Sequence, residues 1–139
     1  MPFLELTIPR LEKERKQQLA ENLTREFIDA TGFENEILSI RFAEYGPGEA
    51  AVNGKLWVEN EGHPYSTILV MTPRLRHDVK RALAAGLARV CAEHLPDPGW
   101  APVIHILEFP YENIEVDGQL LTDADEELSS RPFYYVLPR

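Results

Sequence analysis

The feature that most constrains this chain is an internal repeat at an offset of 64 residues. Without any gap, PRLEKERKQQLAENLTR (9–25) aligns with PRLRHDVKRALAAGLAR (73–89), and eight of the seventeen positions are identical. The same offset pairs further residues along the chain, among them Ile40 with Ile104, Glu44 with Glu108, Val52 with Val116 and Gly54 with Gly118. A constant register over so long a stretch predicts two copies of one supersecondary unit.

Each copy has the pattern of a strand, a helix and a second strand. Short runs rich in β-branched and aromatic residues alternate with longer stretches whose apolar residues recur at helical spacing. Gly32 is placed to end the first helix in the left-handed conformation. The predicted strands are 3–8, 37–45, 66–72 and 103–109, the predicted helices are 12–31 and 77–94, and GPGEAAVNG (46–54) is a predicted hairpin.

Right-handed crossovers make the two strands of each unit parallel. We therefore predict an α+β fold in which duplicated β-α-β units, about 2–57 and 66–121, form a four-stranded mixed sheet with both helices on one face. The chain 1–139 is then a single domain, and its tail, 122–139, has the composition of an edge strand that adds to a neighbouring subunit. The uncovered sheet face predicts association with further copies.

Charge and cysteine content restrict the partners. Fourteen Lys and Arg stand against 23 Asp and Glu, a formal net charge of −9, which opposes binding to nucleic acid or to an anionic membrane. No apolar run approaches the ~20 residues needed to span a bilayer, and charges at Glu5 and Arg10 leave no room for a signal peptide. The single cysteine, Cys91, fits a reducing compartment. We expect a cytoplasmic protein whose partner, if it is a small anion, is held by individually placed arginines.

Sites for metals and cofactors are not predicted. The four histidines have no metal-ligand spacing, and the glycines form neither GxGxxG nor a phosphate loop. His105 is a lone polar residue between Ile104 and Ile106, and it either faces solvent or helps to line a pocket. We expect no cofactor and no metal.

Pro2 directly follows Met1, and two interpretations are open. A proline lacks an amide donor, which is harmless at the first residue of a strand. Alternatively, removal of Met1 would leave the Pro2 nitrogen as a free secondary amine, which can take and give a proton near neutral pH.

Several motifs together resemble a known family. The chain begins with Met-Pro, continues with RLEKERK (10–16) and EYGPGEAAVNG (44–54), and repeats the pattern E-F-P-x5-V-x-G in 108–118. These motifs in a duplicated chain resemble the tautomerase superfamily, typified by 4-oxalocrotonate tautomerase. The fused length resembles the branch of cis-3-chloroacrylic acid dehalogenase and malonate semialdehyde decarboxylase. The resemblance implies a tautomerase/MIF-like fold and a homotrimer.

The same resemblance implies a catalytic site. Pro2 is then the general base and acid, and burial beside arginines lowers the pKa of its amine. Guanidinium groups bind carboxylates through paired donors, and the candidates are Arg10, Arg41, Arg74 and Arg76. The predicted function is a cofactor-independent tautomerase or isomerase that acts on a small 2-oxo or enol carboxylate.

Two alternatives stay open. The histidine of the dehalogenase branch is matched by Phe27 and its water-activating glutamate by Val116, which does not support a specific hydrolytic dehalogenase. A Pro2-dependent hydratase, decarboxylase or dehalogenase on a 3-carbon acid would need Glu115 or Asp117 to activate water. A retained initiator methionine would make the proline nitrogen a tertiary amide without basicity, and the chain would then be a catalytically silent protein of this fold.

Overall fold

The computed structural model describes residues 2–33, 38–59, 66–95 and 102–124. The first half contains β1 (Phe3–Pro9), α1 (Lys13–Thr31), β2 (Ser39–Tyr45) and a short hairpin of β3 (Ala51–Val52) and β4 (Lys55–Leu56). The second half contains β5 (Thr67–Pro73), α2 (His77–His94), β6 (Val103–Phe109), the 3-10 turn η1 (Tyr111–Asn113), a hairpin of β7 (Glu115–Val116) and β8 (Gln119–Leu120), and α3 (Leu121–Ala124).

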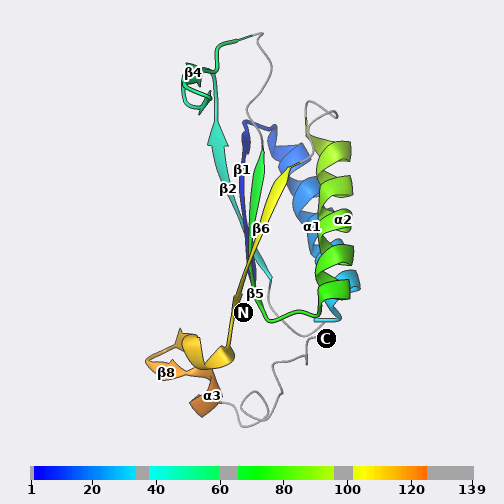
Figure 1. Cartoon of the computed structure of the whole chain (residues 1–139), viewed down its shortest axis with the longest axis vertical. Coiled ribbons are helices and arrows are strands. Elements are labelled where there is room, and N and C mark those ends of the chain that lie inside the picture. Colours follow the sequence, from blue (N-terminus) through cyan, green and yellow to red (C-terminus); the bar gives the residue numbers. More distant parts are fainter. Residues whose placement is uncertain (1, 34–37, 60–65, 96–101, 125–139) are drawn as a thin grey trace.

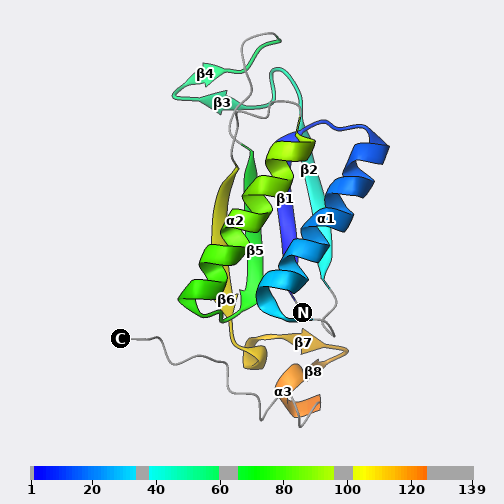
Figure 2. The ribbon, with the colours of Figure 1, turned by 90° about the vertical axis from the view of Figure 1, so that its right-hand side faces the viewer.

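The main sheet has four strands in the order β2-β1-β5-β6. β1 pairs with β2 in parallel, β5 pairs with β6 in parallel, and the central pair β1–β5 is antiparallel. Both long helices lie on one face of this sheet (Figures 1 and 2). The predicted α+β class and mixed sheet are therefore confirmed.

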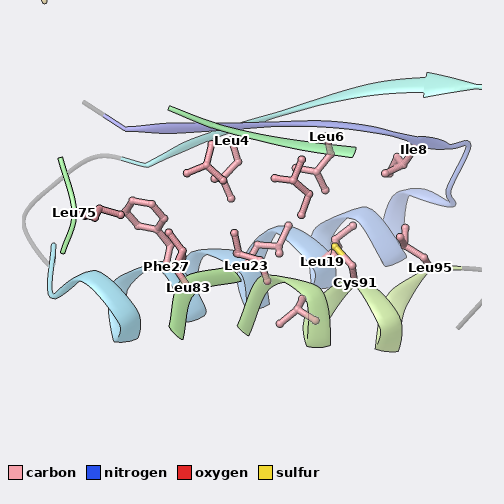
Figure 3. Packing of buried hydrophobic residues seen from close by; sticks show 14 residues of the cluster. Leu4, Leu6, Ile8, Leu19, Leu23, Phe27, Leu75, Leu83, Cys91 and Leu95 are labelled. Carbon is pink, nitrogen blue, oxygen red and sulfur yellow. The ribbon is translucent and has the colours of Figure 1, made fainter. Parts of the chain in front are cut away.

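The core lies between the sheet and the two helices (Figure 3). Alternate strand residues point toward the helices, so Leu4, Leu6 and Ile8 are fully buried in β1. They pack with the apolar stripes of the helices, which include Leu23 and Cys91. Burial raises the pKa of the Cys91 thiol to about 12. Cys91 is thus a core residue.

The joint between strand and helix is built alike in both halves. The Glu44 carboxylate accepts hydrogen bonds from the Leu11 N–H at 2.8 Å and from Lys16 Nζ at 2.6 Å. At an offset of 64, Glu108 accepts from the Leu75 N–H at 2.5 Å and from Lys80 Nζ at 2.5 Å. We call these the two carboxylate clasps. They satisfy the amide at the turn into each helix, where neither N-cap residue supplies a side-chain hydrogen bond.

Helix and strand ends match the expectations closely. Gly32 ends α1 with φ of 73°, and its N–H donates to the Ile28 carbonyl, as predicted. β2 begins at Ser39, two positions after the predicted start. The connection 60–65 and most of the tail, 125–139, lie outside the described residues, so the expected edge strand stays a prediction. No helix in the described part of the chain is long and apolar enough to cross a membrane.

Candidate active site

Pro2 lies at one end of the sheet, directly before β1, and is fully buried. Its carbonyl accepts a hydrogen bond from the Ser39 N–H at 3.4 Å. The antiparallel register pairs Phe3 with Met71, so its continuation places Pro2 opposite Thr72. The chain leaving β5 therefore delivers Arg74 and Arg76 to the Pro2 end of the sheet.

The β7–β8 hairpin lies at this same end, while the β3–β4 hairpin lies at the opposite end (Figures 1 and 2). The β7–β8 hairpin carries two exposed carboxylates, Glu115 and Asp117. Glu115 accepts a hydrogen bond from the Gly118 N–H across the turn. Asp117 occupies the turn with φ of 53°. Of the two, Asp117 is not hydrogen-bonded within its hairpin in the described structure.

The two arginines at the Pro2 end differ in their contacts. Arg76 directly precedes α2, and its Nε lies 3.1 Å from Asp78 Oδ1, in a pair whose side chains are 62% and 67% exposed. Arg74 is also exposed. Within the described ranges it makes no ion pair and no side-chain hydrogen bond. Arg74 is therefore a guanidinium available to an anion.

The other predicted site residues lie elsewhere in the chain. Arg10 follows β1 at the far end of the sheet, where its Nη2 lies 2.6 Å from Glu49 Oε1. Arg41 is exposed in the middle of β2, opposite Glu5. His105 is exposed in β6, on the sheet face that the helices leave open. One copy of the chain thus brings Arg74, Arg76, Glu115 and Asp117 to the end that holds Pro2. It places Arg10 at the opposite end. Arg41 and His105 lie within strands, and Arg41 is two positions after Ser39, whose N–H donates to the Pro2 carbonyl.

Solved structures resemble this one over nearly the whole chain. The F6 fused 4-OT wild-type asymmetric trimer matches with a TM-score of 0.75 at 25% identity, over 88% of this chain and 98% of its own. Pt0534 inactivated by 2-oxo-3-pentynoate matches with a TM-score of 0.73 at 19% identity, over 88% and 97%. N1, a member of the cis-3-chloroacrylic acid dehalogenase family, matches with a TM-score of 0.68 at 18% identity, over 91% and 98%.

The chain has the fused tautomerase fold. The predicted resemblance to the fused form of the tautomerase superfamily is thereby confirmed in three dimensions. No family profile and no curated protein matches the sequence. The likeness therefore rests on the arrangement of the elements and not on sequence identity.

Within the tautomerase fold, the end opposite Pro2 has a different polar arrangement. Ser66 is the counterpart of Pro2 at the offset of 64 and is 3% exposed. Tyr45 is also buried there, with its ring in an edge contact to Trp57 at a centroid distance of 5.7 Å. Burial raises the pKa of Tyr45, and a hydrogen bond with Ser66 acts in the opposite direction. This end therefore buries Tyr45 hydrogen-bonded to Ser66, whereas the other end buries Pro2.

Sequence reasoning did not single out Thr72, the neighbour of Pro2. Its side chain is fully buried, and its Oγ1 has no hydrogen-bond partner in the described part of the chain. The residue is hidden in the apolar run STILVMT, where a β-branched threonine reads as an ordinary strand residue. The described residues contain no group of three or more His, Cys, Asp or Glu that could hold a metal ion.

Proposed function

We propose that this chain is a cofactor-independent tautomerase that acts on a small 2-oxo or enol carboxylate, with Pro2 as general base and general acid. One observation carries the proposal: Pro2 is buried at the sheet end that also holds Arg74, whose guanidinium has no ion-pair partner among the described residues. The fused 4-OT fold supports the same assignment.

The chemistry follows from the state of the Pro2 nitrogen. With Met1 removed, this nitrogen is a secondary amine, and burial disfavours its charged form. The neutral amine takes a proton from the carbon or enol oxygen of the substrate and returns it at the other position, so the carbon–carbon double bond moves without a cofactor. An arginine beside the developing enolate stabilises the negative charge.

We propose that Arg74 binds the substrate carboxylate and that Arg76 assists. Arg10 would reach a Pro2 site only from a neighbouring copy, because its own chain holds it at the opposite end of the sheet. Arg41 and His105 are exposed on their strands, and we propose that they contribute to a site across a contact between copies. The F6 fused 4-OT is a trimer, and we propose a homotrimer for this chain too. The division into units 2–57 and 66–121 is supported by the recurrence of the carboxylate clasps at an offset of 64.

A second candidate is a hydratase, decarboxylase or dehalogenase on a 3-carbon acid. It is favoured by one observation, the exposed carboxylate of Asp117 on the hairpin at the Pro2 end. Glu115 is less suited to activate water because the Gly118 N–H already binds its carboxylate. A silent protein would need Met1 to be retained, and Met1 lies outside the described residues. A cytoplasmic location stays a prediction.

The test compares Met1-free protein, verified by intact mass, with Pro2→Ala. We expect ketonisation of 2-hydroxymuconate or phenylenolpyruvate, followed by ultraviolet absorbance, to fall by about 100-fold or more in Pro2→Ala. Pro47→Ala, at an exposed proline of the opposite end, is the matched control and should keep its activity.

A covalent probe adds a second readout. Because 2-oxo-3-pentynoate inactivates Pt0534, we expect it to label this chain on Pro2 and to leave Pro2→Ala unlabelled, as read by peptide mass spectrometry. Equal ketonisation rates in wild type and Pro2→Ala would contradict the proposal. Activity on 3-carbon acids alone would favour the second candidate.

A further inference from the structure

We infer that Asn113 keeps Arg74 free for the carboxylate of a ligand, whereas Glu49 occupies its counterpart, Arg10. Of these two counterparts, Arg74 at the Pro2 end is then open to an anion and Arg10 is not. The inference rests on the proposed function for the identity of the ligand, and on the contacts of the two arginines for everything else.

Two features hold the Arg10 guanidinium in place: the backbone of Gly46, which has no side chain, and the carboxylate of Glu49. Arg10 Nη2 lies 2.6 Å from Glu49 Oε1, and the Arg10 N–H donates to the Tyr45 carbonyl at 3.2 Å. The guanidinium lies directly over Gly46, because a Cβ built on Gly46 would come within 2.0 Å of Arg10 Nη1. A side chain at position 46 would therefore displace the guanidinium from Glu49.

Two backbone hydrogen bonds of the turn that holds Arg10 recur at the other end. In the first half the Glu49 N–H donates to the Gly46 carbonyl at 3.0 Å, and in the second half the Asn113 N–H donates to the Pro110 carbonyl at 2.9 Å. The hydrogen bond that closes each hairpin recurs as well, from Trp57 N–H to Ala50 at 2.7 Å and from Leu121 N–H to Ile114 at 2.8 Å. The two turns thus share part of their backbone arrangement, but the hydrogen bond from the Arg10 N–H to the Tyr45 carbonyl occurs in the first half alone among the described residues.

Both features that hold Arg10 are missing at the equivalent positions of the second half. Pro110 stands where Gly46 stands in the first half, so a ring replaces the bare backbone, and Asn113 stands in place of Glu49, so a neutral amide replaces the carboxylate. Each of these two differences removes one of the features that hold the arginine in an ion pair. This accounts for the exposed Arg74, which lacks an ion pair within the described ranges.

Within the described ranges the guanidinium of Arg74 makes no ion pair, in a protein of net charge −9. It presents paired donors that match the two oxygens of a carboxylate. The Arg10–Glu49 pair is exposed, with side-chain exposures of 60% and 50%, and such a pair is weak. Glu49 nevertheless excludes dissolved anions because it is tethered beside Arg10 at high effective concentration. Removing the charge of Glu49 should therefore make Arg10 a second binding site for anions.

The experiment titrates oxalate into the full, Met1-free chain and follows the side-chain Nε–Hε signals of Arg74 and Arg10 by NMR, assigned with Arg→Lys variants. In the wild type, oxalate should shift the Arg74 signal and leave the Arg10 signal in place. Asn113→Glu should weaken oxalate binding at Arg74 by about 10-fold or more relative to Asn113→Gln. The Gln side chain has the length of Glu but no charge, so the comparison isolates the charge. Glu49→Gln should make the Arg10 signal respond as well.

Kinetics separate this role from a structural one. Asn113→Glu should raise KM for 2-hydroxymuconate by about 10-fold with kcat changed less than about threefold, because a competing carboxylate removes binding and not chemistry. Asn113 is exposed, and an unchanged circular dichroism spectrum checks that the variants fold.

Three results would overturn the inference: no oxalate shift at Arg74, an equal shift at Arg10 in the wild type, or equal oxalate affinity in Asn113→Glu and Asn113→Gln. Failure of the proposed function has a different signature, since wild type and Pro2→Ala would then show equal rates whatever the oxalate titration reports.

Discussion

Thr72 places a hydroxyl in the core without a hydrogen-bond partner among the described residues. A buried, unpaired hydroxyl costs free energy, whereas an apolar group of the same shape does not. We expect Thr72→Val to raise the free energy of unfolding by about 1 kcal/mol, measured by urea denaturation. Thr67→Val, on the less buried open face of β5, is the control and should change stability less.

A loss of stability in Thr72→Val would contradict this expectation. Thr72 lies opposite Pro2 in the continued register, so such a loss would point to a partner for the hydroxyl in the assembled protein. The melting temperatures of Thr72→Val and Thr67→Val in Met1-free protein show whether loss of the Thr72 hydroxyl raises or lowers stability.

At the scale of single residues, the sequence predicts which residue types the site needs. It does not predict which of those side chains are already held in an ion pair. Pro2 and Arg74 were predicted from the motifs. Arg10 was predicted beside them, but its ion pair with Glu49 depends on the bare backbone of Gly46. Hydrophobic periodicity carries no information about such an exposed contact. Only the difference between Glu49 and Asn113 at the offset of 64 could have indicated it.

The carboxylate clasp joins each helix to the strand beside it. In the first half, hydrogen bonds from Lys16 and then from the Leu11 N–H hold the pKa of Glu44 below its usual 4.5. Because the folded state lowers this pKa, the charged carboxylate stabilises the fold above about pH 4.5, and this stabilisation is lost as the pH falls through the lowered value.

We therefore expect Glu44→Gln to lower the free energy of unfolding by about 1 kcal/mol at pH 7. The difference from the wild type should shrink at acidic pH, where Glu44 of the wild type becomes protonated. Urea denaturation at pH 7 and pH 3 measures both values. Glu21→Gln, at an exposed carboxylate of α1, is the control and should cost less than about 0.5 kcal/mol. A deficit of the same size at both pH values would contradict the role of the charge.

The long elements were predictable because their periodicity extends over many residues. The helices lie within a residue of the predicted ranges, and the four long strands follow the predicted runs. The short hairpins were harder to place. Each of their strands has two residues, and their position is set by positive φ at Asn53 and Asp117, which is a property of the turn and not of a pattern.

At the scale of the whole molecule, one face of the main sheet carries no helix from the part of the chain that the structure describes (Figure 1). On that face the edge strand β6 exposes Val103 by 43% and Leu107 by 49%. In the proposed trimer, neighbouring copies would cover these side chains. We expect Leu107→Arg to reduce the trimer to monomers in size-exclusion chromatography with light scattering, because an unpaired charge would be buried at the contact.

Gln18→Arg, at an exposed position of α1, adds the same charge and should remain trimeric. A trimer that persists in Leu107→Arg, or a wild type that is monomeric, would show that β6 does not lie in the assembly contact.

The antiparallel pairing of β1 with β5 places equivalent positions of the two halves at opposite ends of one sheet. A mutation at one end is therefore structurally remote from its counterpart, and each end can diverge without disturbing the other. Because the two halves align at an offset of 64 residues, each position can be compared with its counterpart in the same chain. Positions that stayed alike, such as Glu44 and Glu108, hold strand to helix. At the equivalent pair Glu49 and Asn113 the two halves differ, and Glu49 contacts Arg10. At such positions a duplicated gene could acquire chemistry in one copy while the other copy preserved the scaffold.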